Sequence, residues 1–513
     1  MTTSTPARGR RVALLACTAL ATAVATVAGA PGAARAQAQP PAPGTPKELR
    51  LPTKRVVTLD NGMRLVLVPF GAVPRAYVQL AVRTGMIDEP RDGTGLAQIT
   101  ATMLDQGTAT RDARQIADEA ASMGGNVAAG AGADVTNVGG EVLAEHAAPF
   151  VTLVADLVRN PSFPADQFAR VRTDAVRRRA IALSQPGEIA RERFRAVMYG
   201  DHPYGRLWAS EAELQGYTPE RARAFHAANF GARRATLYVV GQFDAAAVER
   251  AAREAFGTWA AGTAATVNPP KPRAQRSLTL VDRPGAVQST INMGVPVADP
   301  SHADYTALEV TDALLGGSFG SRITSNIREQ KGYTYSPYSQ VSTRYRDSHW
   351  AEVADVTTDK TGASLTEIFG EVDRLRREAP PPQELKGIQN YVAGVFTLRN
   401  GSRGGVANQL QFLDVHGLPD TYLTGYVGRV MATSPDDVRR IAETYLAPER
   451  MTLVVVGDKQ TVEAQVAPFA SERCVAASSA ISAISATARR RSSRRSPGRS
   501  SCRRCAGRAG RRR

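Results

Sequence analysis

The chain has 513 residues, more than one ordinary hydrophobic core accommodates, so we expect at least two domains. Hydrophobic residues make up 43% and charged residues 22%, which is typical of a globular protein and excludes a disordered one. The net charge is +16, but two segments without acids, 1–36 and 474–513, hold sixteen arginines. The rest is therefore neutral, so we expect no nucleic-acid partner.

The first 36 residues have the pattern of an export signal. Three arginines precede an apolar, alanine-rich stretch at 12–30, and Ala34-Arg35-Ala36 offers the small-x-small pattern that signal peptidase accepts. A membrane anchor is the alternative, but the stretch is only weakly hydrophobic and a Pro-Gly pair ends it. We predict a cleaved signal peptide, a periplasmic or secreted protein without a stable membrane span, and a Pro-rich linker at 37–50.

The first half of the remaining chain alternates between strand and helix patterns. Leu59-Asp60-Asn61-Gly62 marks a tight hairpin turn, because Asn-Gly favours the positive φ angles that such turns need. Apolar periodicity then predicts the other elements. The expected strands are 65–69, 77–83 and 134–143, and the expected helices are 94–104, 111–123, 146–158, 164–184 and 188–199.

Two segments 216 residues apart repeat one pattern of helix cap, helix and strand. Thr218-Pro219-Glu220-Arg221 leads to a strand at 236–241, and Ser434-Pro435-Asp436-Asp437 leads to a strand at 452–457. The second half also opens on strands, at 277–282 and 289–297. We therefore predict a duplicated α+β chain, with domains at 51–261 and 274–470 joined by a Pro-rich linker at 262–273.

Four motifs occur in an order that resembles the insulinase/pitrilysin family of zinc metallopeptidases. They are Asp60-Asn61-Gly62-Met63-Arg64, the run from Asp92 to Thr108, Asp201-His202-Pro203-Tyr204-Gly205, and the run from Arg328 to Ser336. The resemblance covers roughly residues 50–470. It implies two homologous insulinase-like domains, each a largely antiparallel sheet covered by helices, which form half of a clamshell.

Active members of the family carry His-x-x-Glu-His on the first helix. This spacing places both histidines on one face to hold zinc, and the glutamate polarises the attacking water. The aligned positions here are Gln98, Ala101 and Thr102, and the region of the distal glutamate ligand reads Arg177-Arg178-Arg179. The six histidines lie elsewhere, with no two at helical ligand spacing. We predict a degenerate metal site, with no cofactor in this chain and no peptide cleavage by the chain alone.

These residues also have ordinary interpretations. Gln98 and Thr102 fit a polar helix face, and the arginine run fits a solvated helix face. The alternative for the arginines is a contact with acidic residues of a partner subunit. His202, which precedes a proline, is best interpreted as a structural turn residue.

Arg328 and Tyr335 stand seven residues apart in the second half. In the family, an arginine and a tyrosine at this spacing reach the active site, where they hydrogen-bond the substrate backbone and support the oxyanion. Guanidinium and phenol groups suit this task because both stay protonated donors near neutral pH. The alternative is that Arg328 pairs with a neighbouring glutamate and Tyr335 packs into the core from a strand.

The resemblance implies a division of labour like that of two-subunit bacterial members of the family, in which one chain holds zinc and the other carries the Arg/Tyr pair. We expect this chain to bind peptides or unfolded segments and to complete the active site of a zinc-bearing partner in a heterodimer. The alternative is a structural or peptide-binding scaffold without peptidase activity, like core subunits of the mitochondrial cytochrome complex.

The last 40 residues depart from the family. Residues 474–513 are rich in Arg and Ser, lack apolar periodicity and contain three of the four cysteines. We predict a disordered tail, which is either an out-of-frame ending or a genuine basic segment for anionic surfaces. The fourth cysteine, Cys17, lies in the predicted signal peptide. The body has none, so its fold should not depend on the redox compartment.

Overall fold

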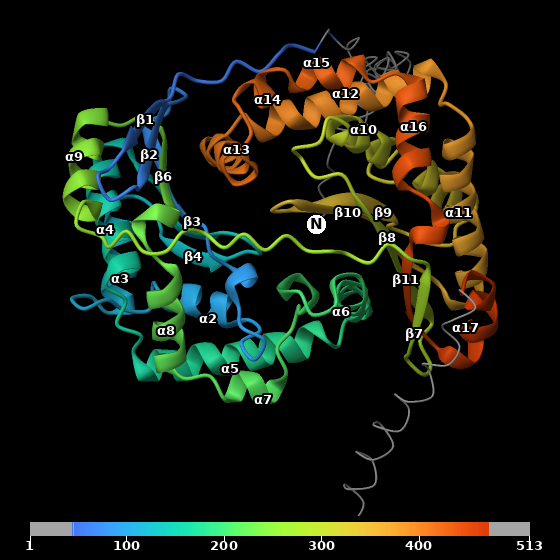
Figure 1. The fold of residues 1–513 in the computed structure, drawn as a ribbon, viewed down its shortest axis with the longest axis horizontal. Helices are drawn as coiled ribbons and strands as arrows, with labels where there is room; N and C mark the ends of the chain where they lie inside the picture. Colours follow the sequence, from blue (N-terminus) through green and yellow to red (C-terminus); the bar gives the residue numbers. More distant parts are fainter. Residues whose placement is uncertain (1–43, 45, 471–513) are drawn as a thin grey trace, which may run out of the picture. The chain divides into compact units, whose positions relative to one another are not determined.

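The computed structural model describes residues 44 and 46–470, which form two β-sheets with helices around them (Figure 1). The predicted signal peptide, most of the Pro-rich linker and the Arg-rich tail lie outside the described residues. None of the helices in the described part is both long and apolar enough to cross a membrane.

The first sheet has six strands in the order β1-β2-β6-β3-β5-β4. All of its neighbouring pairs are antiparallel except β2 and β6. The hairpin between β1 and β2 turns at Gly62, whose φ of +90° is readily adopted by glycine, as the sequence predicted. The strands are β1 Arg55–Thr58, β2 Arg64–Pro69, β3 Arg75–Val82, β4 Ala128–Ala131, β5 Thr136–Leu143 and β6 Ala235–Gly241.

The second sheet has five strands in the order β7-β11-β8-β10-β9. Again one pair, β7 with β11, is parallel and the others are antiparallel. The predicted α+β class with two largely antiparallel sheets is therefore confirmed. The strands are β7 Ser277–Asp282, β8 Gln288–Val297, β9 Tyr338–Arg344, β10 Asp347–Thr357 and β11 Thr452–Gly457.

The two sheets show the duplication that the 216-residue repeat predicted. Helix α8 (Pro219–Asn229) leads to β6, and helix α16 (Pro435–Tyr445) leads to β11. Each helix begins at a hydroxyl cap: Thr218 accepts a bond from the Arg221 amide at 3.4 Å, and Ser434 accepts one from the Asp437 amide at 3.1 Å. β6 and β11 then occupy the same place in their sheets, between a parallel and an antiparallel neighbour.

The helices expected from periodicity in the first half are present, with ends shifted by a few residues. Residues 257–276, which include the predicted linker, form no helix or strand, and the domain boundaries stay a prediction.

The other helices of the first half are α2 Leu96–Met103, α3 Ala113–Ser122, α4 Ala147–Arg159, α5 Ala165–Ala182, α6 Pro186–Tyr199, α7 Glu211–Gln215 and α9 Ala245–Phe256. Those of the second half are α10 Tyr305–Leu315, the π-helix η5 Thr324–Gln330, α11 Thr361–Arg377, α12 Pro382–Arg399, α13 Arg403–His416, α14 Thr421–Thr424, α15 Tyr426–Ala432 and α17 Lys459–Val466.

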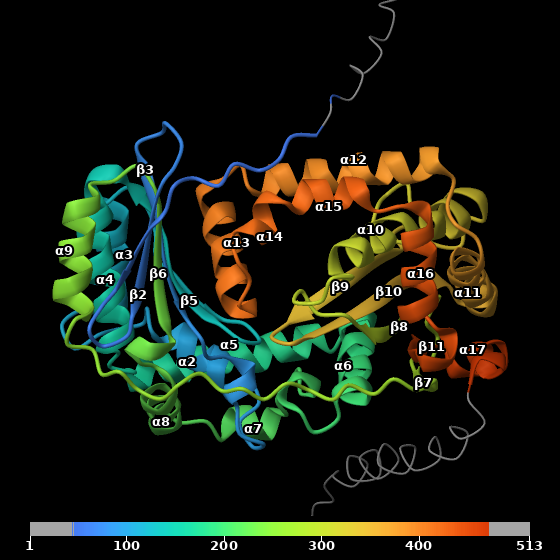
Figure 2. The same ribbon diagram turned by 45° about the horizontal axis from the view of Figure 1, so that its top comes forward.

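The two halves exchange one helix each (Figure 2). Helix α6 of the first half packs on β8 and β11 of the second sheet, where Phe194 and Met198 join a buried cluster with Val454. Helix α13 of the second half packs on β3 and β6 of the first sheet, and Arg403 forms a 2.7 Å ion pair with Glu141. This exchange brings α6 and its arginines to the boundary between the halves.

Candidate functional site

The three positions aligned with the zinc-binding motif lie on α2. The Gln98 amide Nε2 donates to Thr102 Oγ1 at 3.2 Å, and its Oε1 accepts a bond from the Ala131 amide of β4 at 3.2 Å. Thr102 Oγ1 donates to the Gln98 carbonyl at 2.9 Å, and Ala101 is 0% exposed. Gln98 and Thr102 therefore form a hydrogen-bonded polar patch, while Ala101 belongs to the core.

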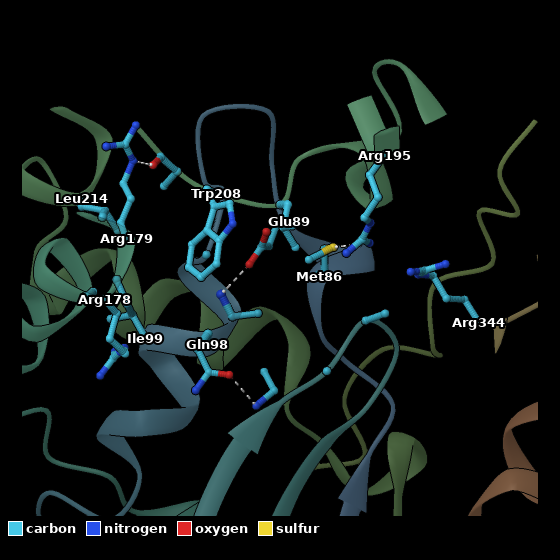
Figure 3. A pocket seen from close by; sticks show the side chains of 18 of the residues that line it. Met86, Glu89, Gln98, Ile99, Arg178, Arg179, Arg195, Trp208, Leu214 and Arg344 are labelled. Atoms are coloured by element: carbon cyan, nitrogen blue, oxygen red, sulfur yellow. Dashed lines mark hydrogen bonds between the residues drawn. The ribbon is translucent and has the colours of Figure 1, made fainter. Parts of the chain in front are cut away.

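The arginine run lies near the end of α5, and its members differ in environment. Arg177 is exposed and forms an ion pair with Asp174 at 3.2 Å. Arg178 and Arg179 line a cavity of about 420 Å³ that Gln98 also lines (Figure 3), and Arg179 Nε donates to the Ala209 carbonyl at 2.6 Å. The solvated-face interpretation fits Arg177 and Arg178, which are both exposed, although Arg178 also lines the cavity; Arg179 is partly buried there.

The cavity does not fit a zinc ion. Zinc sites in proteins use histidine, cysteine and carboxylate ligands, and Glu89 is the only such side chain among the lining residues. Within residues 44 and 46–470, no group of three or more such side chains is placed to hold a metal ion. The guanidinium groups of Arg178 and Arg179 add a positive charge that repels a cation.

Two further arginines line the same cavity, and the sequence analysis did not single them out. Arg195 comes from α6, and Arg344 ends β9 of the second sheet. Arg195 is 7% exposed, and its Nη2 lies 3.5 Å from the Met86 sulfur. Burial, with repulsion from Arg344, lowers the pKa of Arg195 to about 9, so it remains a cation at neutral pH.

Glu89 lies among these arginines in Figure 3, with Arg178 and Arg179 on one side and Arg195 and Arg344 on the other. Its Oε1 accepts a bond from the Ala97 amide at 3.0 Å. Burial raises the pKa of Glu89 to about 7 despite this bond. The cavity therefore has an excess of positive charge at neutral pH.

A second candidate surface surrounds Arg328 and Tyr335, which the structure brings together. The Arg328 guanidinium carbon lies 5.1 Å from the centre of the Tyr335 ring and 4.5 Å from that of Phe319. Both rings are unusually open to solvent, with Tyr335 79% and Phe319 71% exposed. The alternative in which Tyr335 packs into the core from a strand is wrong, whereas the pairing of Arg328 with Glu329, at 3.3 Å, is present.

The chain around this surface explains why Tyr335 stays exposed. Ile327 anchors η5 in the core, and its carbonyl accepts a bond from the Tyr333 amide at 2.8 Å. The chain turns at Gly332, which has a φ of +66°. Thr334 then pairs with β10, where its Oγ1 donates to the Asp355 carbonyl at 2.6 Å. Tyr335 follows these contacts and lies outside both sheets.

His202 is confirmed as a turn residue. Its Nδ1 accepts a bond from the Tyr204 amide at 3.2 Å, and its Nε2 donates to the Asn268 carbonyl at 2.9 Å. Burial lowers the pKa of His202, which favours the neutral ring that these two bonds require. The ring thus ties the turn after α6 to the segment that joins the two sheets.

The chain is similar to two domain families of the M16 peptidases and to uncharacterized proteins named as zinc proteases. Residues 71–210 match the family described as "Insulinase (Peptidase family M16)", and residues 216–392 match "Peptidase M16 inactive domain". An uncharacterized zinc protease of Mycobacterium tuberculosis is 28% identical over 362 residues, which cover 70% of this chain and 80% of that protein. An uncharacterized zinc protease of Bacillus subtilis is 24% identical and covers 66% of this chain and 83% of its own length.

Two solved structures show the same fold. The peptidase M16 inactive domain from Pseudomonas fluorescens has a TM-score of 0.73 at 23% identity, covering 79% of this chain and 98% of its own. A protease from Helicobacter pylori has a TM-score of 0.74 at 21% identity, covering 80% of this chain and 100% of its own.

Proposed function

Because this chain belongs to the insulinase (M16) peptidase family, we propose that it is a zinc-free subunit that completes the active site of a zinc-bearing partner peptidase. One observation carries the proposal: a partly buried Arg328 contacts the exposed ring of Tyr335, in a chain that has neither histidine nor glutamate at positions 98, 101 and 102 of helix α2. Zinc would belong to the partner.

The surface around Arg328 suits contact with a peptide backbone. The guanidinium and the phenol are hydrogen-bond donors, and a peptide carbonyl or a developing oxyanion is the matching acceptor. The contact between Arg328 and the two rings, worth about 0.5–1 kcal/mol at an exposed site, helps to orient these donors. An exposed tyrosine and phenylalanine also offer apolar area to an extended ligand.

The proposal includes the setting in which the subunit works. The signal-like pattern at 1–36 supports a periplasmic or secreted location for the proposed heterodimer. Its ligands would be peptides or unfolded segments, because backbone donors and acceptors are free only when a chain is not folded.

We expect the purified chain alone to bind well below one equivalent of zinc and to leave peptides intact. The same chain, isolated from its native host, should co-purify with a partner carrying His-x-x-Glu-His, and this complex should cleave peptides in a chelator-sensitive manner. Metal analysis and turnover of a fluorogenic peptide library measure both. One tightly bound zinc with chelator-sensitive activity in the isolated chain contradicts the proposal, and a complex lacking the motif favours the scaffold.

Restoring the motif should not restore activity. The triple substitution Gln98→His, Ala101→Glu and Thr102→His leaves the distal ligand missing, and Arg178 and Arg179 keep their positive charge beside the cavity. The new glutamate also replaces a fully buried alanine, which costs several kcal/mol unless the carboxyl is protonated. We expect no metal-dependent turnover above that of the unaltered chain in the same assay.

If the triple variant is folded by circular dichroism and turns over peptide with added zinc, the metal site is more complete than these contacts indicate. A matched variant with only Gln98→His and Thr102→His separates metal binding from the cost of burying the glutamate.

A further inference from the structure

The cavity beside α2 has a cationic lining. Among its lining residues are four arginines and a single acid, Glu89. The arginines come from three elements: Arg178 and Arg179 from α5, Arg195 from the next helix, α6, and Arg344 from β9 of the other sheet. Such convergence of cations on one cavity favours an anionic ligand.

Arg195 is the strongest indication of a ligand. Its side chain is more than nine-tenths buried, yet no carboxylate of the described residues lies within ion-pair distance, and its Nε has no hydrogen-bond partner among them. Arg344, by contrast, has a carboxylate 3.9 Å from its Nη1, on Asp347. Burying a guanidinium without an anion destabilises the fold. A role in binding an anionic ligand therefore accounts for Arg195 better than packing does.

The wall of the cavity supplies a second unused donor and an apolar surface. The indole Nε1 of Trp208 is buried and has no acceptor among the described residues. Ile99 and Leu214 line the same space as Trp208 (Figure 3). A volume of about 420 Å³ lies within the usual range for a small-ligand site and is large enough for a short peptide end.

We propose that this cavity binds a carboxylate of a peptide, with Arg195 as its principal charge partner and the Trp208 side as the wall for the neighbouring side chain. Guanidinium donors match the geometry of a carboxylate in bidentate pairs. Four arginines and one acid leave the cavity positively charged even after one carboxylate binds, so its charge accommodates such an anion. The apolar wall beside Trp208 favours a carboxylate that carries a neighbouring side chain over a free phosphate. The proposal rests on the cavity residues alone and does not require a partner subunit.

The test uses the full chain without any partner. Three probes are titrated by calorimetry and by indole fluorescence: acetyl-Ala-Ala-Leu with a free carboxylate, its C-terminal amide, and acetyl-Ala-Glu-Ala amide. We expect the free acid to bind about tenfold or more tightly than its amide, because the amide loses a charge-assisted bond. The third probe reports whether a side-chain carboxylate is accepted as well as a terminal one.

Arg195→Gln should weaken binding of the free acid by about tenfold or more, while the thermal midpoint of the unliganded chain stays the same or rises. The matched control is Arg193→Gln, an exposed arginine on the same helix, which should change neither. Trp208→Phe should remove the fluorescence response, because Trp259 and Trp350 are buried outside the cavity lining.

Equal affinity for the free acid and both amides overturns the proposal. So does unchanged binding of the free acid by a folded Arg195→Gln variant. A lowered thermal midpoint in that variant, with binding retained, assigns Arg195 a structural role instead. None of these outcomes depends on the Arg328 surface. The experiment therefore tests carboxylate binding in the cavity independently of the proposed subunit function.

Discussion

Tyr335→Phe is expected to lower peptide turnover by the reconstituted pair by about 100-fold or more, with little change in assembly. The substitution removes one donor to the transition state, and the loss of a single oxyanion donor typically has an effect of this size. The ring keeps its contact with Arg328, which depends on the aromatic face and not on the hydroxyl. Turnover is measured at matched concentrations of wild-type and variant complex.

Arg328→Lys should also lower turnover, because an ammonium cannot reproduce the planar fork of donors. The control for hydroxyl loss is Tyr391→Phe, at a half-exposed tyrosine on α12. Its turnover should match that of the wild type. Unchanged turnover in a fully assembled Tyr335→Phe complex removes the catalytic role and leaves the scaffold interpretation.

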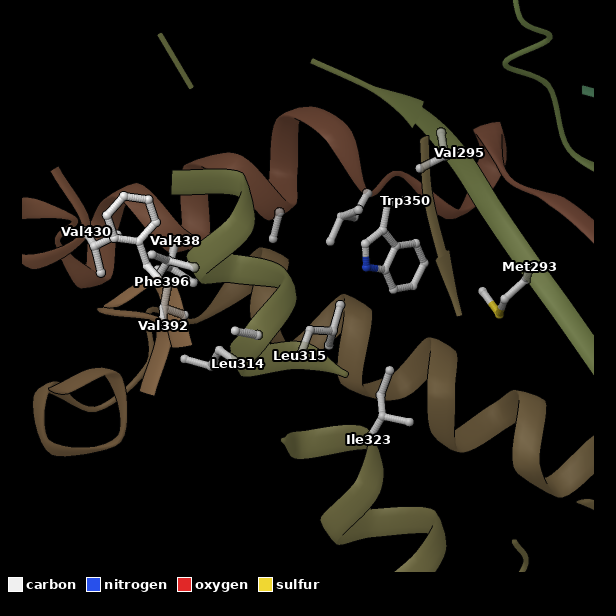
Figure 4. Packing of buried hydrophobic residues seen from close by; sticks show 14 of the residues in the cluster. Met293, Val295, Leu314, Leu315, Ile323, Trp350, Val392, Phe396, Val430 and Val438 are labelled. Atoms are coloured by element: carbon white, nitrogen blue, oxygen red, sulfur yellow. The ribbon is translucent and has the colours of Figure 1, made fainter. Parts of the chain in front are cut away.

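Trp350→Ala is expected to lower the free energy of unfolding by about 3–5 kcal/mol, the usual range for removing a large buried aromatic side chain. Trp350 lies on β10, is 0% exposed and packs in the core of the second half (Figure 4). Its Nε1 donates to Asp312 Oδ1 at 2.9 Å, so the substitution also removes a donor from a buried carboxyl group. Urea unfolding followed by circular dichroism measures the loss.

Trp350→Phe removes the hydrogen bond to Asp312 but keeps an aromatic ring in the core. The loss of unfolding free energy that it causes should depend on pH. Burial raises the pKa of Asp312 from 3.8 to about 6, so folding loses stability from this group as the pH rises from about 4 through 6. Burial and the charge of Asp312 raise the pKa of neighbouring Glu352 as well, which favours its neutral form. The indole donor stabilises ionised Asp312, so the variant should lose more at pH 8 than at pH 5. An equal loss at both pH values contradicts this assignment.

The elements of the chain could be predicted because their signals are local. Asn61-Gly62 specifies a turn, and Thr218 and Ser434 cap helices through bonds to amides three residues ahead. The 216-residue repeat also predicted a duplicated fold, because two segments with the same local pattern are expected to form the same helix and strand. The exposure of Tyr335 is different. It depends on the turn at Gly332 and the pairing of Thr334 with β10, which periodicity does not reveal.

The absence of histidine and glutamate at positions 98, 101 and 102 follows from the sequence alone, and the degenerate metal site that it predicts stays a prediction. The cationic cavity beside α2 could not be predicted from the sequence. Arg195 lies between Phe194 and Met198 on the apolar side of α6, and that placement was its only signal in the sequence. The surroundings of Arg195 depend on the packing of α6 against the second sheet and on the position of Arg344 at the end of β9. Charge and burial at such a site are set by packing between distant segments, and so only the tertiary structure decided them.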